Sequence, residues 1–518
     1  MPASAVRKRK RRSLRQAMAD GRGQQIAPQT ERRFESAYTD RLNEAHWSLA
    51  SGQHINDRLR LDLDRLIDRI AHEAINNPMV EGVIETHVAD VVGPTGPTLQ
   101  VQSDSESFNQ WFENEAWSPW WVTPDAERRR CGVDILGGWV RGLWRTGNPI
   151  TELVSDPSAP RELGLDITLR LKAHHARYLV EPVGSRMTSG HVAIRGVEIE
   201  PSFGRAVAYH LVRAVDQATY NGWGGETVRI PAANVLHLYR IVEEGQALGV
   251  PLLASCLQTI ADLRDADVQI LDAIRQAADF AVGLYSEDPD AEPLDPGTSI
   301  PFERRQMTAL PGGYKPESLK GEQPSTDVLA FRDEKLRELG RPAGMPLEKV
   351  KASSKDMNFS QTKHGQGNYW RCVESLRGLI DREGLRRLAW QVERETRAAQ
   401  LVAGRRVPAM PTTRAGRPDY QIIANWPPPP KIDPRIEAMA LAIERGAGGK
   451  TMTQIAEANG LTLEQLVEQH AREMKVYADR GVPYPVPADA LKAAAAMGGE
   501  ADDEADKPSE PQPEPADA

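Results

Sequence analysis

The stretch PLLASCLQTIADLRDADVQILDAIRQAADFAV, residues 251–282, predicts one long amphipathic helix around which the rest of the chain is organised. Its apolar side chains recur three or four residues apart, the spacing of one helix face. Pro251 suits the first turn of a helix, where its missing N–H is not needed. The pattern covers roughly 32 residues and would extend about 48 Å if unbroken. The apolar positions are Leu253, Leu257, Ile260, Leu263, Ile270, Leu271, Ile274 and Ala278.

Two further helices are predicted on the C-terminal side of this one. Residues 325–339 carry apolar side chains at helical spacing, and residues 361–402 do so again, with a break expected near Gly378 or Gly384. The intervening residues 286–323 are rich in Pro, Gly and acidic side chains, which favours irregular structure.

The connections beyond these helices are also informative. Residues 341–360 hold two prolines and a glycine near their start and predict a loop. Residues 408–430 end in four consecutive prolines, which favour a stiff, extended backbone. A small helical module is predicted from residue 434 to about residue 480.

The N-terminal side begins with two amphipathic helices. The first has apolar residues from Leu59 to Ala74 and stops at Asn76-Asn77-Pro78; the second runs from Val80 to Val91 and ends at Gly93-Pro94. Further elements are a strand at 98–102, helices at 107–117 and 133–144, and strand-like runs at 167–171, 192–199, 206–212 and 235–239. The predicted fold class is therefore α+β and mainly helical. At 518 residues the chain is too long for one hydrophobic core.

Charge is distributed unevenly along the chain. The net charge is −9, yet residues 7–12 read RKRKRR and residues 500–518 are acidic and proline-rich. We expect both ends to be disordered, because neither can bury enough apolar surface. The basic arm fits nucleic acid or an acidic scaffold as well as it fits a solvated tail. We expect no membrane span and no secretory signal, since no apolar stretch approaches the necessary length.

The chemistry-bearing residues give no catalytic pattern. Cys131, Cys256 and Cys372 have no paired spacing, and we expect three small buried side chains in a reducing compartment. GAGGKT at residues 446–451 has Glu444 where a phosphate-binding loop needs glycine, which predicts a helix end and a new start at Thr451. His174 and His175 would point to opposite faces of a strand. No catalytic residue, metal site or cofactor is expected.

Five blocks, in order, resemble the lambda-type phage portal protein family. The resemblance covers about residues 38–481, and the sequence departs from it at Ala247, where the family often has arginine, and at residues 358–361. The matching blocks are Asn76-Asn77-Pro78 with Val91-Val92-Gly93; Gly196-Val197-Glu198 with residues 204–210 (GRAVAYH); residues 230–239 with 245–251 (GQALGVP); Asn358-Phe359-Ser360; and Trp426-Pro427-Pro428 with Ile432-Asp433-Pro434.

The resemblance implies a portal-type subunit with wing, two-helix stem, clip, channel loop and helical crown. The implied parts are a basic arm at 1–37, a wing at 38–250, stem helices at 251–285 and 324–341, a clip at 286–323, a channel loop at 342–360, a long helix returning through the wing at 361–430, a crown at 431–485 and an acidic tail at 486–518.

The resemblance also implies a function and its partners. Portal subunits form a ring of about twelve copies at one capsid vertex, through which DNA is packaged and ejected. The implied partners are double-stranded DNA, the terminase large subunit, head-completion or neck proteins, and the major capsid or scaffold protein, with no membrane. Assembly would take place in the host cytoplasm. The alternatives are another capsid-associated structural protein, such as a scaffold or minor head protein, and a DNA-processing enzyme.

Three lysines of the implied channel loop are candidate DNA contacts. Every phosphate neutralised by Lys or Arg adds salt-dependent affinity, so a channel that lets DNA slide should carry few basic groups. Lys349, Lys351 and Lys355 fit such passing contacts, and they fit solvated loop charges equally well.

Overall fold

The computed structural model describes residues 52–182, 190–213, 226–278, 282–286, 314–318, 326–353, 359–429, 439–441, 443–445, 448–458 and 463–482. The arm expected at 1–37, the tail expected at 486–518 and most of 286–323 lie outside these residues. The chain divides into two units, Met1–His54 and Ile55–Ala518, and the elements below belong to the second.

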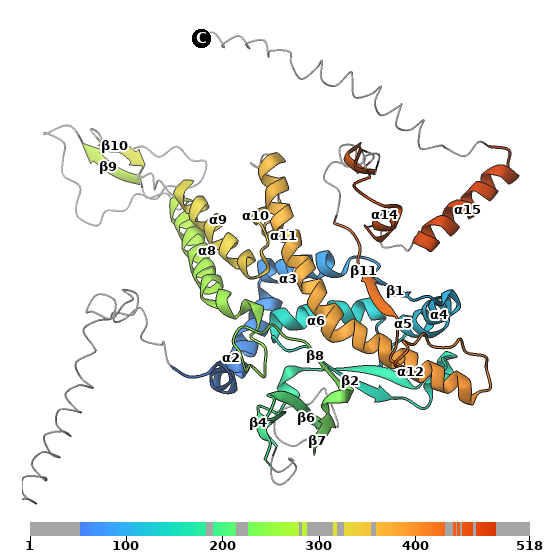
Figure 1. Ribbon diagram of the computed structural model, residues 1–518. Coiled ribbons are helices and arrows are strands. Elements are labelled where there is room, and N and C mark those ends of the chain that lie inside the picture. The colour runs from blue at the N-terminus through green and yellow to red at the C-terminus, as the bar shows by residue number, and fades with distance from the viewer. Residues whose placement is uncertain are drawn as a thin grey trace, which may run out of the picture. The chain divides into compact units, whose positions relative to one another are not determined.

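The described part of the second unit is mainly helical, with four small sheets, so the α+β class is confirmed (Figure 1). Its α-helices are α2 (Ile55–Asn76), α3 (Pro78–Val92), α4 (Glu106–Trp111), α5 (Ser118–Val122), α6 (Gly132–Arg145), α7 (Ala159–Leu163), α8 (Leu257–Ala278), α9 (Thr326–Gly340), α10 (Leu347–Val350), α11 (Phe359–Ile380), α12 (Arg386–Val402), α14 (Met452–Ala458) and α15 (Leu463–Asp479).

Local sequence signals set the boundary between α2 and α3. Asn77 caps α3, because its side chain accepts a hydrogen bond from the Met79 amide at 3.1 Å, and Pro78 occupies the first turn. Gly93 ends α3 with a φ of 73°, a conformation that favours glycine. The predicted helix boundaries are confirmed here.

The strands form four antiparallel sheets, in the orders β4-β5-β6-β7, β3-β2-β8, β1-β11 and β9-β10. Their bounds are β1 (Thr98–Gln102), β2 (Ile150–Ser155), β3 (Leu169–His174), β4 (Val192–Ile194), β5 (Val197–Glu200), β6 (Arg205–Arg213), β7 (Glu226–Pro231), β8 (Val235–His237), β9 (Val282–Ser286), β10 (Tyr314–Ser318) and β11 (Gln421–Asn425). The pairing of β1 with β11 joins two parts of the sequence more than 300 residues apart.

The single strand predicted at 192–199 is wrong, because β4 and β5 form a hairpin there. Arg195 and Gly196 make the turn with φ values of 45° and 82°. A Cβ atom on Gly196 would lie 2.9 Å from the His210 carbonyl oxygen, so only glycine fits this close approach.

Aromatic side chains fill much of the larger core. Trp111, Phe112, Trp117, Trp120 and Trp144 are buried in a cluster that also includes apolar residues of α3, α9, α11 and α12. A second cluster packs α2 against the strands of the four-stranded sheet. The first elements of the chain are thereby fixed to helices that come much later.

The helix predicted over 251–282 is shorter than expected. Pro251 has an extended ψ of 136°, so it precedes the helical segment instead of forming its first turn. A 3-10 helix at Leu252–Cys256 comes next, and α8 then runs only to Ala278. Val282 belongs to β9, which pairs with β10.

The predicted loop at 341–360 is also partly wrong, because it contains a 3-10 turn at Arg341–Ala343 and the short helix α10. The break expected within 361–402 is confirmed near Gly384 and takes the form of a π-helical turn at Asp381–Leu385. A Cβ atom on Gly384 would lie 2.5 Å from Trp139, so the glycine lets the turn approach the aromatic core.

The cysteine prediction needs correction, because only Cys256 is buried; Cys131 is partly exposed and Cys372 is exposed. Of the prediction for residues 446–451, the new helix start at Thr451 is confirmed, while residues 446 and 447 lie outside the described residues. Thr451 precedes α14, and its hydroxyl accepts a hydrogen bond from the Gln454 amide at 3.3 Å while the Gln454 side chain accepts from the Thr451 amide at 3.0 Å.

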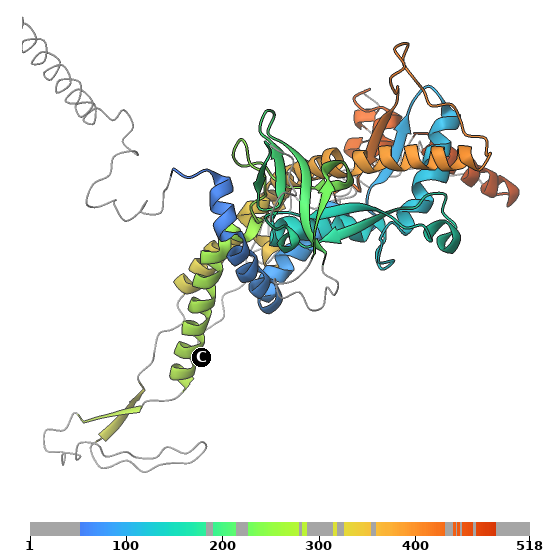
Figure 2. The ribbon, with the colours of Figure 1, turned by 90° about the horizontal axis from the view of Figure 1, so that it is seen from below.

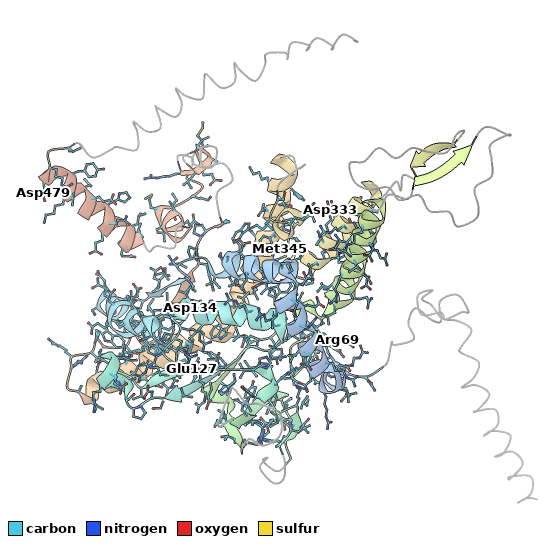
Figure 3. All side chains as sticks on the ribbon, turned by 180° about the vertical axis from the view of Figure 1, so that it is seen from behind. Arg69, Glu127, Asp134, Asp333, Met345 and Asp479 are labelled. Atoms are coloured by element: carbon cyan, nitrogen blue, oxygen red, sulfur yellow. The ribbon has the colours of Figure 1, made fainter. Side chains whose placement is uncertain are left out.

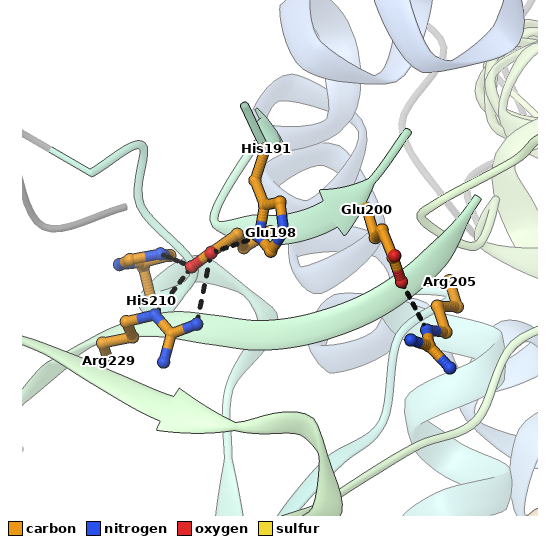
Figure 4. A network of polar contacts seen from close by, with 6 residues as sticks. All are labelled: His191, Glu198, Glu200, Arg205, His210 and Arg229. Atoms are coloured by element: carbon orange, nitrogen blue, oxygen red, sulfur yellow. Dashed lines mark hydrogen bonds and ion pairs between the residues drawn. The ribbon is translucent and has the colours of Figure 1, made fainter. Parts of the chain in front are cut away.

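A buried carboxylate holds the four-stranded sheet together (Figure 4). Glu198 is fully buried on β5 and accepts hydrogen bonds from His191 at 2.8 Å, from His210 at 3.0 Å and from Arg229 at 2.8 Å. These partners come from three different parts of the sheet region. Glu200, two residues along the same strand, instead pairs with the exposed Arg205 at 2.6 Å.

Glu198→Gln should lower the free energy of unfolding by about 3 kcal/mol, because it leaves the buried His210 and the partly buried His191 and Arg229 without their carboxylate. Chemical denaturation measures this. The matched control, Glu200→Gln, removes a carboxylate from the same strand but from an exposed pair, and should cost no more than about 1 kcal/mol. Equal losses in the two variants would contradict the role assigned to Glu198.

Candidate functional site

The segment that joins α9 to α11 is the implied channel loop, and part of it is well defined. Asp333 and Met345, labelled in Figure 3, lie on α9 and in the turn that follows it. The Met345 amide donates to the Gly340 carbonyl oxygen at 2.9 Å and closes the end of α9. Gly344 has a φ of 68° and lies against Cys372 of α11. The chain therefore turns sharply here before α10 begins.

Lys349 is bound within the subunit. Its Nζ lies 2.6 Å from Oδ2 of Asp90 at the end of α3, and its side chain is 17% exposed. The Tyr369 hydroxyl donates to the same carboxylate oxygen at 2.8 Å. Burial, followed by the nearby Asp90 charge, raises the pKa of Tyr369 above its ordinary value, so this tyrosine stays a donor. Lys349 thus links α10 to α3 and α11.

Lys351 lies nearer the surface. Its Nζ contacts the Asp333 carboxylate of α9 at 2.9 Å, and its side chain is 35% exposed. Lys355 falls outside the described residues. Of the two described lysines, Lys351 is the one with a side chain open enough to exchange its carboxylate for a phosphate.

Arg377 on α11 is the polar centre of this region. It is 6% exposed, and its guanidinium donates to the carbonyl oxygens of Val91 at 2.8 Å, Asp90 at 2.9 Å and Pro427 at 2.9 Å. The group also stacks near the rings of Trp370 and Trp426, 5.4 and 5.3 Å from their centroids. Burial lowers the pKa of Arg377, yet an arginine remains charged in proteins.

Arg377 brings two of the sequence blocks together. The carbonyl groups of Asp90 and Val91 end α3, where the negative end of the helix dipole favours a cation. Gly93 follows directly, and a Cβ atom there would lie 2.8 Å from Pro427. The close approach of Pro427 therefore requires glycine directly after α3.

Asp90, Tyr369 and Arg377 were not among the residues expected from the sequence to carry function. A signal was present: buried residues of α11 repeat at helical spacing, and Arg377 lies four residues after Val373 on that same face. A charged residue on an apolar helix face marks a buried polar contact.

The block GQALGVP forms a loop fixed by buried amides. Asn148 donates to the Gly249 carbonyl oxygen at 2.9 Å and accepts from the Gly249 amide at 2.6 Å. Gln246 accepts from the Val242 amide at 2.8 Å, and Asn56 of α2 accepts from the Ala247 amide at 2.9 Å. The loop just before α8 is thus tied to α2 and to the turn after α6.

Helices α8 and α9 lie side by side and run in opposite directions (Figure 2). In the sequence, the paired strands β9 and β10 come between them. Three polar contacts join the helices: Thr259 with Glu338 at 3.0 Å, Lys335 with Asp262 at 3.9 Å and Arg332 with Asp267 at 2.9 Å.

Apolar side chains on the same two helices remain exposed. They are Val268, Leu271, Ile274 and Phe331, of which Leu271 is 51% exposed. The three on α8 are three residues apart and therefore share one face of the helix. This face has no cover within the described residues.

The histidines do not form a metal site in the described part of the chain, where no group of three metal-binding side chains occurs. His174 contacts Glu152 at 2.8 Å, while His175 accepts from the Arg177 amide at 3.3 Å. His87 is buried and accepts from the Trp144 indole at 2.7 Å. Among the described helices, none has the length and apolar character of a membrane span.

Comparison with known proteins identifies a protein family whose model matches this chain. The model of "Phage portal protein, lambda family" matches residues 41–377. No curated protein matches the sequence.

The chain is also similar to three solved structures. A chain of the "Neck of native GTA particle computed with C12 symmetry" is 12% identical with a TM-score of 0.44, and the match covers 80% of this chain and 97% of that one. A chain of the "Virion of native gene transfer agent (GTA) particle" is 13% identical with a TM-score of 0.43, covering 81% and 99%. An HK97 family phage portal protein from Corynebacterium diphtheriae is 12% identical with a TM-score of 0.27, covering 56% and 82%. Because the family model spans well over half of the sequence, this chain belongs to the lambda family of phage portal proteins.

Proposed function

We propose that this portal protein assembles into a closed ring of about twelve subunits at one capsid vertex and forms the channel for DNA packaging and ejection. The observation that carries the proposal is the paired α8 and α9, which leave an apolar face uncovered. Residues 251–285 and 324–341 would be the stem, and 431–485, which include α14 and α15, the crown.

The stem proposal follows from how α8 and α9 are held. Their polar contacts align the two helices within one subunit, and exposed ion pairs contribute little to stability. The uncovered face of Val268, Leu271 and Ile274 would be buried against the next subunit of the ring. When one surface of a subunit binds a different surface of the next copy, the copies close into a ring if the rotation from one copy to the next is a whole fraction of a full turn.

Residues 286–323 would form the clip, of which the structure describes Ser286 at the end of β9 and the strand β10. This part would dock the terminase large subunit and later the neck or head-completion proteins. The wing at 38–250 would contact the capsid or scaffold protein. No catalytic step is assigned to the chain; its contribution is a scaffold through which DNA moves.

Residues 342–360 would face the channel. In the described portion of this segment, Lys349 and Lys351 each pair with a carboxylate, which keeps the positive charge low. Weak, exchangeable contacts suit DNA that must slide, since strong phosphate binding would retain it. We propose Lys351 and Lys355 as the passing contacts. Lys349 would reach DNA only after releasing Asp90.

Replacing Leu271 and Ile274 together with Asp should prevent ring formation while the subunit stays folded, because buried acidic groups would have to enter the interface. Native mass spectrometry measures subunit number, and thermal unfolding of the monomer reports folding. Leu61→Asp, at an apolar α2 position that is 69% exposed, is the control and should form rings normally. Rings of the double variant would contradict the stem contact.

Lys349→Ala should reduce stability, whereas Lys351→Ala should reduce DNA packaging or retention. Loss of Lys349 leaves Asp90 without its cation and should lower the free energy of unfolding by about 2 kcal/mol. Loss of Lys351 should change stability by no more than about 0.5 kcal/mol but reduce packaging or retention of DNA, with rings intact. Packaging assays beside denaturation curves check both. Normal packaging by Lys351→Ala and by a Lys351→Ala/Lys355→Ala double variant would remove these lysines from the channel proposal.

A further inference from the structure

A cavity of about 610 Å³ lies beside the proposed channel segment, and nothing assigned so far uses it. Its apolar lining includes Leu252, Leu376 and Leu379. Its wall on one side is formed by Pro342 and Ala343, the residues that follow α9. An occupant of this cavity would therefore contact the connection between α9 and α11.

The rim of the cavity is strongly basic. Arg240, Arg371 and Arg382 line it and are exposed, while one carboxylate, that of Glu383, lies among them. Arg240 reaches the Pro342 carbonyl oxygen only at 3.4 Å. Within the described ranges, none of the three arginines has an ion pair to a carboxylate. The rim thus offers three guanidinium groups to an acidic ligand.

Two buried histidines, His87 and His237, also line the cavity. Burial, opposed by the Asp90 charge and assisted by the Arg240 charge, lowers the pKa of His87 to about 4. His237, on the same wall, is buried and contacts Asn148 at 3.0 Å. The deep part of the cavity therefore holds neutral imidazoles and apolar carbons, and its charges stay at the rim.

This arrangement fits an acidic peptide better than a nucleic-acid backbone. A peptide can place carboxylates beside the arginines and small apolar side chains against the leucines, whereas a nucleic-acid backbone has only phosphates and polar sugars to offer. Residues 500–517 contain eight Asp or Glu residues, one Lys and four Pro, with Ala among them. Proline reduces the conformational freedom that binding would remove.

We propose that the arginine-rimmed cavity binds the acidic segment 500–517 of the chain, either of the same subunit or of a neighbouring copy. The linking residues 483–499 could span up to about 60 Å when extended. Bound there, the segment would cover Cys372 and contact Pro342 and Ala343. This inference does not depend on ring formation.

Cys372 makes the proposal testable in the full-length chain, because its exposed thiol lines the cavity. A Cys131→Ser/Ser509→Cys variant leaves two accessible thiols, one in the cavity and one in the acidic segment. A short bis-maleimide should join positions 372 and 509, and peptide mass spectrometry identifies the link. Mixing ¹⁵N-labelled with unlabelled chains distinguishes a link within one subunit from a link between copies.

Adding Arg371→Glu and Arg382→Glu to that variant should lower the yield of the 372–509 link by about tenfold, the change expected when two charge contacts become repulsive. The matched control adds Arg414→Glu and Arg417→Glu, which reverse two exposed arginines outside the cavity, and should leave the yield unchanged. A monofunctional maleimide checks that Cys372 remains reactive in every variant. No link in the parent variant, or equal yields in both charge-reversed variants, would overturn the proposal. So would a labelled DNA duplex that displaces the segment and binds through Arg371 and Arg382.

Discussion

The buried guanidinium of Arg377 is the contact on which the rest of this subunit depends. It satisfies two carbonyl groups at the end of α3 and one after β11, and it is enclosed by two indole rings. A buried charge is tolerated only when its hydrogen bonds are made, so α3, α11 and the Pro427 segment must adopt one relative arrangement. Asp90, whose carbonyl oxygen Arg377 binds, also anchors Lys349 and Tyr369 through its carboxylate. The start of the proposed channel loop is therefore fixed to the body by a network that begins at Arg377.

That rigidity contrasts with the way α8 and α9 are held. Near the body, Cys256 and Leu336 are buried, and polar contacts keep the helices aligned; farther out, apolar side chains of α8 are exposed. A subunit of this kind is incomplete alone, because burying such a face on another copy gains hydrophobic free energy. The subunit thus combines a fixed anchor for the proposed channel loop with an uncovered apolar face on the proposed stem helices.

Much of this fold could be predicted from sequence, and the failures have physical causes. Asn77-Pro78 and Gly93 bounded α3 correctly because cap and left-handed conformations are local properties. The hairpin at 192–200 was missed because Arg195 adopts a positive φ that sequence patterns do not signal. The extended Pro251 and the π-helical turn at Asp381–Leu385 depend on packing, the latter on Trp139 against Gly384. The burial of charged residues such as Glu198 and Arg377 was not predicted, because charged side chains are expected to be exposed when an apolar pattern is read. Two of the candidate channel lysines could be placed, and their pairing with Asp90 and Asp333 required the tertiary structure.

The most direct test of the account is electron cryo-microscopy of the purified full-length protein. The account predicts closed rings of about twelve subunits, with α8 and α9 paired in each subunit, Leu271 and Ile274 buried against the next copy, and residues 342–353 facing the central channel. A monomer at assembly concentrations, or a ring in which the exposed face of α8 contacts solvent, would contradict it.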